Sequence, residues 1–380
     1  NYILDKIKIC CFSNGHGFTA KHRIPLLVHL RNKGYNITCI APYKSDAYKI
    51  FDSYDFICYE IALSRHGVNI FKEIKSLFNL YSIFKKERPN ILINATIKPV
   101  LYGTAISIFF SRTKVVNLIT GLGYSFSTKT IKANIIKIIT LIFYNLIFIF
   151  SKKQKVVFQN NKDKKFILKN TYLKEKNTFL ISGSGIDPNQ FKLLPQNKKN
   201  FEVILAGRMI WGKGVKSFVD SAKLVKNIYP DTSFKLVGPL DLDSNEAIQL
   251  ETIKEWEDQN YIEWMGNIDN MTLIYKEASV VVLPSHSEGL PKTLMEASMC
   301  GRPIITTNIE GCKEVLIDGV TGFLISIDNP IELADKIMQL IENKELARSM
   351  GKKGRKYIKE NFSTEIVIPK LSRAIESVIA

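Results

Sequence analysis

The chain has 380 residues, of which 46% are hydrophobic and 23% are charged. The composition is that of a globular protein, and the chain is too long for a single hydrophobic core. Its length suits two domains of roughly 150–200 residues each. Residues 1–182 hold 29 Lys and Arg against 9 Asp and Glu, whereas residues 183–380 hold 24 against 27. The net charge of +17 therefore arises in the first half, which we expect to face nucleic acid, anionic lipid or a phosphorylated substrate.

The six cysteines show no CxxC pair and no zinc-ligand spacing. This pattern is typical of a reduced, cytoplasmic protein. The sequence opens on Asn1 and runs directly into a strand-like segment without a signal-peptide pattern.

Short apolar runs alternate with longer helical patterns along the chain. The strands predicted in the first half are KIKICCF (6–12), YNITCIAP (35–42), FICYEI (56–61), NILINA (90–95) and KVVNLI (114–119). The helices between them are PLLVHLRNKG (25–34), VNIFKEIKSLFNLYSIFKKERP (68–89) and KPVLYGTAISIFF (98–110). The second half adds the strands FEVILAGR (201–208), SFKLVG (233–238), YIEWMG (261–266), ASVVVLPS (278–285), RPIITT (302–307) and TGFLI (321–325). Strands without period-2 alternation, separated by helices, predict an α/β fold with two doubly wound, Rossmann-like domains.

The domain boundary is expected in residues 180–200, which gather Gly, Ser, Asp, Pro and Lys with little periodicity. We predict a first domain over 1–182, a second over 183–362, and a helix over 363–380 that crosses back to the first.

Residues 135–155 form an unusually apolar segment. Its core from Ile138 to Phe150 carries no charge, and lysines flank it on both sides. With roughly 13–16 apolar residues it is shorter than the ~20 that span a bilayer. A buried core helix and a helix lying in the membrane plane both fit, and the lysines favour anionic lipid in the second case. A transmembrane span fits least, because the strand VVF (156–158) follows at once.

A glycine-rich loop follows the strand in VILAGRMIWGKGV (203–215). Its glycines allow close approach of a ligand, and Arg208 and Lys213 together suit a diphosphate. The loop matches neither the P-loop nor the G-x-G-x-x-G pattern. Two exposed loop charges remain the alternative.

The segment SHSEGLPKTLMEAS (285–298) follows another strand and carries Glu288 and Glu296. Pro291 is placed to begin a helix, so Glu288 lies in the loop before it and Glu296 about one and a half turns inside. The free amides of the helix start would face anionic groups, and the carboxylates would accept hydrogen bonds from sugar or ribose hydroxyls. A metal site is disfavoured because His286 and Glu288 have no third ligand in view.

Two loops of the first half also follow strands, at Gly15-His16-Gly17 and at Thr120-Gly121-Leu122-Gly123. They lie on the ligand side of the predicted sheet, where Lys21 and His22 add polar reach. A structural role for the histidines and a tight turn at residues 120–123 are the alternatives.

These motifs resemble the retaining glycosyltransferases of the large family-four group, which have the two-Rossmann GT-B fold with a central cleft. The resemblance rests on ISGSGIDPNQF (181–191), AGRMIWGKG (206–214) and the run from Ser285 to Ile325, which contains Glu-x7-Glu and Gly-x-x-Glu-x4-Gly-x-x-Gly-Phe. It is specific in the second half and looser in the first.

The resemblance implies a role for each donor-side residue. Glu288 would contact the donor sugar, Glu296 the nucleotide ribose, and Arg208 and Lys213 the diphosphate, whose developing charge they would offset. Catalysis is assigned to Glu288, Arg208 and Lys213. The donor-binding set is Gly207, Arg208, Lys213, Ile268, Glu288, Gly289, Leu290, Pro291, Lys292, Thr293, Leu294 and Glu296. The resemblance also implies retention of the anomeric configuration, no metal, and no cofactor beside a UDP-sugar donor.

The first-half loops depart from the family pattern. Many members have a histidine where this chain has Thr120-Gly121-Leu122-Gly123. This variant is similar to bacterial enzymes that add an N-acetylhexosamine to a sugar on undecaprenyl diphosphate. The residues expected on the acceptor or interdomain side are Gly15, His16, Gly17, Lys21, His22, Thr120, Gly121, Leu122 and Gly123.

The expected function is therefore transfer of a sugar from UDP to a lipid-diphosphate-linked saccharide in bacterial surface polysaccharide, O-antigen or glycan biosynthesis. The protein would be cytoplasmic and peripheral at the inner membrane face, with residues 130–155 on the membrane and no nucleic-acid partner. One alternative is a GT-B nucleotide-sugar epimerase. Another is a basic nucleic-acid-binding protein, although the aromatic residues of the basic half lie in apolar runs instead of alternating with Arg and Lys.

Overall fold

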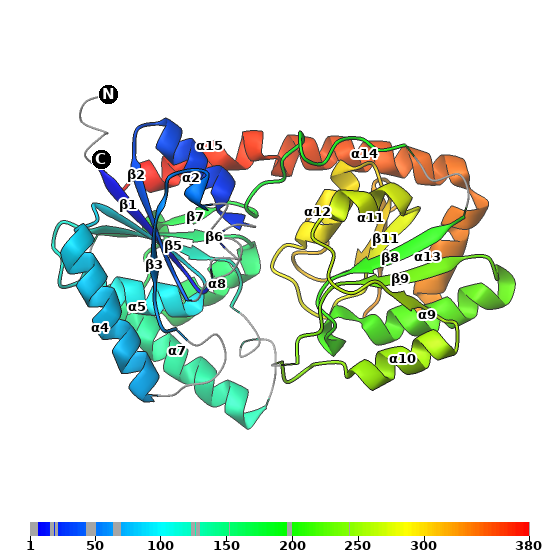
Figure 1. The fold of residues 1–380 in the computed structure, drawn as a ribbon, viewed down its shortest axis with the longest axis horizontal. Coiled ribbons are helices and arrows are strands. Elements are labelled where there is room, and N and C mark those ends of the chain that lie inside the picture. Colours follow the sequence, from blue (N-terminus) through cyan, green and yellow to red (C-terminus); the bar gives the residue numbers. More distant parts are fainter. Residues whose placement is uncertain are drawn as a thin grey trace. The chain divides into compact units, whose positions relative to one another are not determined.

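The computed structural model describes residues 7–379 except 16–18, 20–21, 43–50, 64–69, 123–125, 127–129, 152, 196–199 and 243. The chain divides into two compact units, each of which contains its own sheet (Figure 1). Unit 1 comprises Asn1–Gly185 and Thr364–Ala380, and unit 2 comprises Ile186–Ser363.

Within the described residues, unit 1 contains a seven-stranded parallel sheet in the order β3-β2-β1-β4-β5-β6-β7. Its strands are β1 (Lys8–Ser13), β2 (Asn36–Ala41), β3 (Ile57–Glu60), β4 (Ile91–Ala95), β5 (Lys114–Ile119), β6 (Gln154–Phe158) and β7 (Thr178–Leu180). All five residues of β4 are buried. Continuous burial replaces alternation because helices cover both faces of the sheet.

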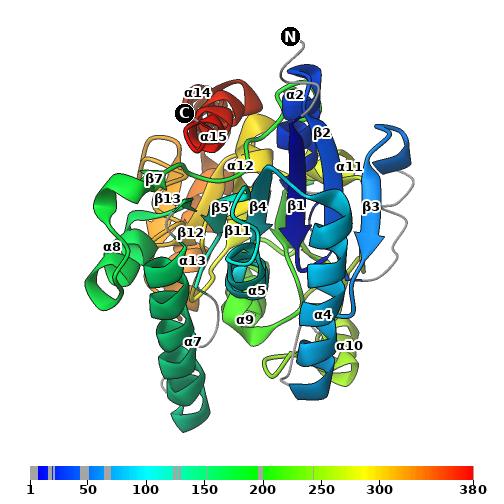
Figure 2. The same ribbon diagram turned by 90° about the vertical axis from the view of Figure 1, so that its left-hand side faces the viewer.

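The two faces of this sheet pack against different helices. Ile9 and Cys11 face α2 (Ile24–Asn32) and α15 (Thr364–Glu376). Cys10 and Phe12 face the opposite layer. That layer contains α4 (Ile70–Glu87), α5 (Ile97–Ser107), α7 (Ile131–Phe150) and α8 (Asn161–Asn170), and Figure 2 shows α4 and α7 on either side of α5.

In the part of the chain that is described, unit 2 contains a six-stranded parallel sheet in the order β10-β9-β8-β11-β12-β13. Its strands are β8 (Glu202–Ala206), β9 (Ser233–Val237), β10 (Glu263–Trp264), β11 (Val280–Leu283), β12 (Ile304–Thr307) and β13 (Gly322–Ile325). Its helices are α9 (Val215–Ile228), α10 (Leu250–Asp258), α11 (Met271–Glu277), α12 (Lys292–Met299), α13 (Pro330–Glu342) and α14 (Lys344–Phe362). The prediction of two α/β units with parallel sheets is confirmed.

Helix α7 is longer and more exposed than the apolar core of its sequence indicates. It begins at Ile131, where the Thr130 side chain caps it by accepting a hydrogen bond from Ala133 N. Among the described helices, α7 alone is long and apolar enough to cross a membrane, judged by length and composition. The expectation that this segment is too short to span a bilayer was therefore wrong. However, one stripe of the helix packs on the unit 1 core through Tyr144 and Ile147. Only 28% of the Ala133–Phe150 window is buried, which also excludes a buried core helix.

The chain leaves unit 1 after Gly185 and returns to it at Thr364. A Cβ on Gly185 would lie 2.9 Å from the Thr364 Cα, and Gly185 has a φ of +84°, so glycine suits this position on both counts. In unit 2, the Ile186 amide donates to the Phe362 carbonyl at 2.9 Å. The outgoing and returning segments therefore run side by side.

Candidate functional site

The candidate site lies at the carboxyl-terminal edge of the unit 2 sheet. Strands β8 and β11 are neighbours, yet the chain continues from β8 towards β9 and from β11 towards β12, in opposite directions. Ligands of open α/β sheets bind beyond the strand ends at such a switch point. The two loops that meet there span residues 207–214 and 284–291.

Direct hydrogen bonds fasten these two loops together. The Ser285 hydroxyl and the His286 amide both donate to the Gly212 carbonyl, at 2.9 and 3.0 Å. Gly214 has a φ of +72°, and a Cβ there would lie 1.9 Å from the Pro284 carbonyl oxygen. Only glycine permits this close approach, so the sequence Gly-Lys-Gly fixes one loop against the other.

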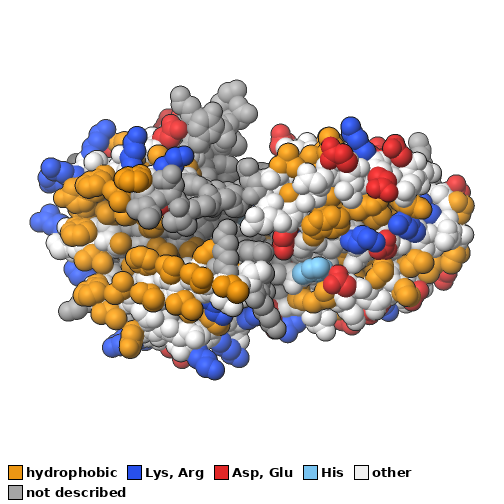
Figure 3. Space-filling view, turned by 90° about the horizontal axis from the view of Figure 1, so that it is seen from below, with side chains coloured by type: hydrophobic (Ala, Val, Ile, Leu, Met, Phe, Trp, Pro, Cys, Tyr) orange, Lys and Arg blue, Asp and Glu red, His pale blue; other side chains and the backbone are white. Residues whose placement is uncertain are grey.

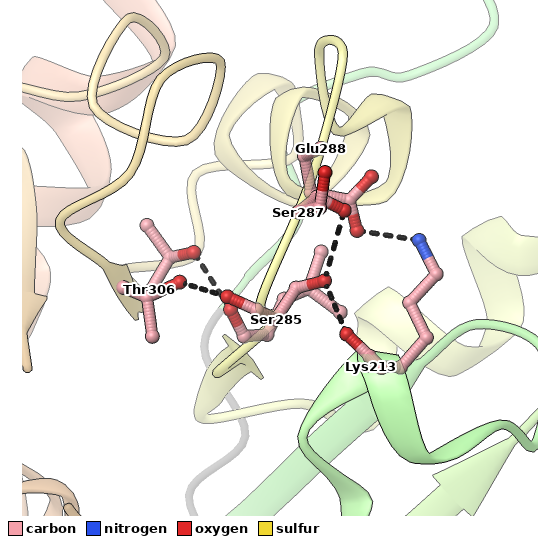
Figure 4. A network of polar contacts seen from close by, with 8 residues as sticks. Lys213, Ser285, Ser287, Glu288 and Thr306 are labelled. Carbon is pink, nitrogen blue, oxygen red and sulfur yellow. Dashed lines mark hydrogen bonds and ion pairs between the residues drawn. The ribbon is translucent and has the colours of Figure 1, made fainter. Parts of the chain in front are cut away.

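An ion pair joins the loops at their centre. The Lys213 ammonium group donates to Glu288 Oε1, and the two side chains are 19% and 11% exposed. Figure 4 shows the Lys213 amine directed at the Glu288 carboxylate, above the Ser285 hydrogen bonds. Thr306 in β12 donates to the carbonyl of Leu283, the last residue of β11, at 2.7 Å, and so supports the strand end from which the second loop begins. A cation and a carboxylate are thereby presented together at the edge of the sheet.

The second predicted cation also has an acidic partner. Arg208 donates from its guanidinium group to Asp241, which follows β9. Each cation of the candidate diphosphate site is therefore paired with a carboxylate. A diphosphate bound here would replace these carboxylates or share the two cations with them.

Helix α12 supplies the third part of the site. It begins after Pro291 without a side-chain cap, and the start of a helix is a place that favours an anion. Glu296 lies inside this helix and is buried, which excludes a solvated surface position. Its carboxylate accepts a hydrogen bond from the Tyr275 hydroxyl at 3.0 Å and lies 3.5 Å from Lys292 Nζ.

The structure brings the predicted donor-binding residues to one edge of unit 2. Gly207, Arg208 and Lys213 follow β8, and the set from Glu288 to Glu296 follows β11. Ile268 lies in the loop after β10 and packs, with Leu290, beside the core cluster that contains Leu294.

The predicted first-half residues lie in unit 1 and are only partly described. Gly15 follows β1, and Thr120, Gly121 and Leu122 follow β5, with β4 between these strands. His22 Nδ1 lies 3.5 Å from the Ser184 hydroxyl. His16, Gly17, Lys21 and Gly123 lie outside the described residues.

A buried carboxylate supports the loop after β5. Asp163 in α8 accepts hydrogen bonds from the Leu122 amide and from Asn160 Nδ2, the latter at 2.9 Å. Burial raises the pKa of Asp163 above its ordinary range, and these hydrogen bonds oppose the rise. Asp163 therefore supports the segment Thr120-Gly121-Leu122 that follows β5.

Sequence reasoning missed Asp241, Asp163 and Tyr275. The signal for Asp241 was present, because GPLDLD follows a predicted strand and must therefore lie at the same edge as Arg208. The described residues contain no group of three or more His, Cys, Asp or Glu that could hold a metal ion. All six cysteines are free thiols, and burial followed by the Glu288 charge raises the pKa of Cys312 to about 12.

Comparison with known proteins identifies the class. Residues 186–357 match the family model of group 1 glycosyl transferases, and residues 8–160 match that of glycosyl transferase 4-like proteins. Anabaena HepE, solved in complex with UDP and glucose, has a TM-score of 0.78 at 16% identity, covering 98% of this chain and 100% of its own. The fold is thus that of GT-B glycosyltransferases. The chain belongs to the group 1 glycosyltransferase family.

Two curated relatives share about a quarter of their residues with this chain. One is the N,N'-diacetylbacillosaminyl-diphospho-undecaprenol alpha-1,3-N-acetylgalactosaminyltransferase of Campylobacter jejuni, at 26% identity over 87% of this chain and 88% of the relative. The other is the UDP-Gal:alpha-D-GlcNAc-diphosphoundecaprenol alpha-1,3-galactosyltransferase of Escherichia coli, at 26% identity over 78% of each chain.

Proposed function

We propose that this glycosyltransferase moves a sugar of N-acetylhexosamine type from UDP to a saccharide carried on a lipid diphosphate, in bacterial surface polysaccharide or glycan biosynthesis. The observation that carries the proposal is the Lys213–Glu288 pair at the switch point, beside Arg208 and the start of α12. The two curated relatives act on undecaprenol-diphosphate sugars, and HepE was solved with UDP, which supports both substrate classes.

In the proposed reaction, the bond between the sugar C1 and the diphosphate breaks while the acceptor oxygen bonds to C1 on the same face. The acceptor hydroxyl proton passes to the departing diphosphate. Arg208, Lys213 and the α12 amides stabilise the negative charge that develops on this leaving group. Glu288 holds the donor sugar hydroxyls and Glu296 the ribose, so both carboxylates position the substrate. The configuration is retained and no metal is used.

A donor screen tests the proposal. UDP-N-acetylgalactosamine, UDP-N-acetylglucosamine and UDP-uronic acids are incubated with a lipid-diphosphate sugar acceptor, with and without EDTA. We expect a UDP-N-acetylhexosamine donor to react, and we expect EDTA to leave the activity unchanged. NMR of the product should show the same anomeric configuration at the new linkage as in the donor. Inversion, or loss of activity in EDTA, would contradict the proposed mechanism.

A nucleotide-sugar epimerase is the competing function on the same fold. It needs no acceptor, so donor alone would yield an epimer or free UDP at the full rate. For a transferase, release of UDP from donor alone should be slow and should rise when acceptor is added. A gel-shift assay with duplex and single-stranded nucleic acid tests the remaining alternative.

We further propose that the protein is cytoplasmic and binds the inner face of the plasma membrane through unit 1. Ile131 is 82% exposed, and nine further large apolar side chains of α7 are exposed, among them Ile138 and Phe150. A second exposed apolar stripe lies on α4, on the other side of α5 (Figure 2), and includes Phe71, 85% exposed, and Phe78, 69% exposed. Figure 3 shows hydrophobic side chains in orange bands on unit 1, with Lys and Arg at their edges. Residues 101–150 hold five Lys and Arg and no acid, so an anionic headgroup layer is the complementary surface.

Liposome binding tests this membrane proposal separately from the chemistry. We expect co-sedimentation with vesicles containing anionic lipid at low salt, weakened by salt and by replacement with zwitterionic lipid. Absence of binding, together with full-rate transfer to a water-soluble acceptor analogue, would rule out a membrane role for α7.

A further inference from the structure

The second glutamate of the Glu-x7-Glu motif has a buried hydrogen-bond donor behind it. Tyr275 in α11 is fully buried, and its hydroxyl donates to Glu296 Oε2 at 3.0 Å. The same hydroxyl lies 3.2 Å from the Thr293 carbonyl in the first turn of α12. Tyr275 thus contacts both the carboxylate and the helix start of the candidate donor site.

We infer that Tyr275 is a positioning residue for nucleotide recognition, which it serves by fixing the Glu296 carboxylate so that Oε1 is presented to the ribose hydroxyls. The inference rests on the proposed function, in which Glu296 binds the ribose. Nothing in the motif itself specifies this partner, because Tyr275 lies 21 residues from Glu296 along the chain.

A glutamate side chain has three rotatable bonds, so a carboxylate without fixed partners would lose conformational freedom each time it bound a ribose. A hydrogen bond from a rigid donor removes that loss in advance. The donor here is held firmly, since the Arg302 guanidinium is buried and donates through Nε to the Tyr275 carbonyl at 2.7 Å. Tyr275 also packs among the apolar side chains of the unit 2 core.

The chemistry of the pair keeps the phenol in its donor form. Burial, and then the Glu296 charge, raise the pKa of Tyr275 well above its ordinary value. The hydroxyl therefore carries its proton throughout the working pH range and always donates. Lys292 Nζ lies 3.5 Å from Oε1, the other carboxylate oxygen, and a ribose hydroxyl can donate there as well.

The test compares two isosteric variants in the full chain. Tyr275→Phe removes the hydroxyl beside Glu296. Tyr229→Phe removes a hydroxyl that donates to Glu342 at 2.6 Å on the surface of the same unit, and so serves as the matched control. Each protein is titrated with UDP and with 2′,3′-dideoxy-UDP, which lacks both ribose hydroxyls. The quantity compared between proteins is the dissociation constant of dideoxy-UDP divided by that of UDP.

We expect Tyr275→Phe to weaken UDP binding about tenfold, with little change for the dideoxy nucleotide, so that the ratio falls towards one. The KM for the donor should rise while kcat stays near that of the wild type, and Tyr229→Phe should change neither. A purely structural role would lower the melting temperature and leave the ratio intact, because the ratio is measured within the folded protein. An unchanged ratio in Tyr275→Phe overturns the inference.

Glu296→Ala, which removes the acceptor oxygens, separates this inference from the proposed function. If Glu296→Ala keeps the wild-type ratio, Glu296 does not bind the ribose and the site assignment itself fails. If Glu296→Ala lowers the ratio but Tyr275→Phe does not, only the positioning role of Tyr275 is wrong. In a double variant, the two effects should be less than additive, because both act on one hydrogen bond to the ribose.

Discussion

Lys213 and Glu288 have an internal control elsewhere in the same unit. Lys235 and Glu202 form an ion pair whose side chains are also 19% and 11% exposed, and Glu202 begins β8, at the opposite end of the sheet from the site. The two pairs therefore match in burial and charge and differ in their position relative to the ligand edge.

We predict that Lys213→Ala and Lys235→Ala lower the free energy of unfolding by similar amounts, about 1–2 kcal/mol, since each leaves a partly buried carboxylate without its partner. Only Lys213→Ala should lower kcat, by about 100-fold or more, because in the proposed site only Lys213 contacts the diphosphate. Urea titration and steady-state kinetics measure the two effects.

The opposite pattern would contradict the site. Equal loss of activity in the two variants would mean that the effect of Lys213→Ala is one of stability. Glu288→Ala provides an independent check, because a protein that kept full activity without this carboxylate could not use it to hold the donor sugar.

At the level of single residues, the sequence predicts those whose role follows from a strand, a glycine and a helix start close together. Arg208, Lys213 and Glu288 belong to this group. Tyr275 does not, because one tyrosine in a helical pattern is indistinguishable from an ordinary core residue until folding places it against Glu296. Asp163 was hidden in the same way, since its contact with Leu122 joins two different strand-helix units.

Among the helices, α4 and α7 each expose an apolar stripe, and this leads to a prediction about α4. We expect a tryptophan in Phe78→Trp to enter the acyl-chain region when the protein binds anionic vesicles, because Phe78 lies on the outer stripe of α4. Quenching of its fluorescence by brominated lipid measures the insertion. Ile331→Trp is the control, as Ile331 is 64% exposed but belongs to unit 2.

Quenching of both reporters to the same extent would indicate contact that is not specific to unit 1. No quenching of the Phe78→Trp reporter, with vesicle binding intact, would limit the membrane contact to α7. The native tryptophans give a constant background, because all three belong to unit 2.

Packing between α2 and α15 predicts a dependence of stability on pH. Burial, and then the Lys33 charge, lower the pKa of His29, while Glu376 opposes the shift. The unfolded chain then binds the proton more readily than the folded one, so this stability is present above the ordinary value of about 6.5 and is lost as the pH falls through the lowered pKa.

We therefore expect the wild type to lose more stability than His29→Gln between pH 7.5 and pH 5. Urea titrations at both pH values give the difference between the two proteins, in which the carboxylates common to both cancel. Equal losses would show that His29 titrates alike in the folded and unfolded chains.

Elements with long apolar runs were predictable, and the short edge strand β7 was not. The run NILINA predicts β4, which the structure places at Ile91–Ala95. By contrast, β7 spans only Thr178–Leu180 after the polar residues Glu175–Asn177, and the predicted strand YIEWMG is reduced to two residues in β10. The length of such edge strands depends on the hydrogen bonds that a neighbouring strand offers, and that information lies outside their own sequence.

For the whole molecule, we predict that the two compact units unfold in separate transitions. Trp211, Trp256 and Trp264 all lie in unit 2, so their fluorescence reports on this unit alone. We predict that UDP at a hundred times its dissociation constant stabilises the fluorescence transition by about 2.7 kcal/mol. A shift confined to the transition seen only by circular dichroism would place the nucleotide in unit 1.

The neighbouring positions of Gly185 and Thr364 have a consequence for the architecture of the gene product. Unit 2 is a continuous insertion whose two ends emerge side by side, whereas unit 1 is assembled from both ends of the chain. Replacing residues 186–363 by a short linker would therefore leave every strand of the seven-stranded sheet and α15 joined. Unit 2 could therefore be exchanged for the corresponding unit of another glycosyltransferase, and under the proposed function this exchange would change the donor preference.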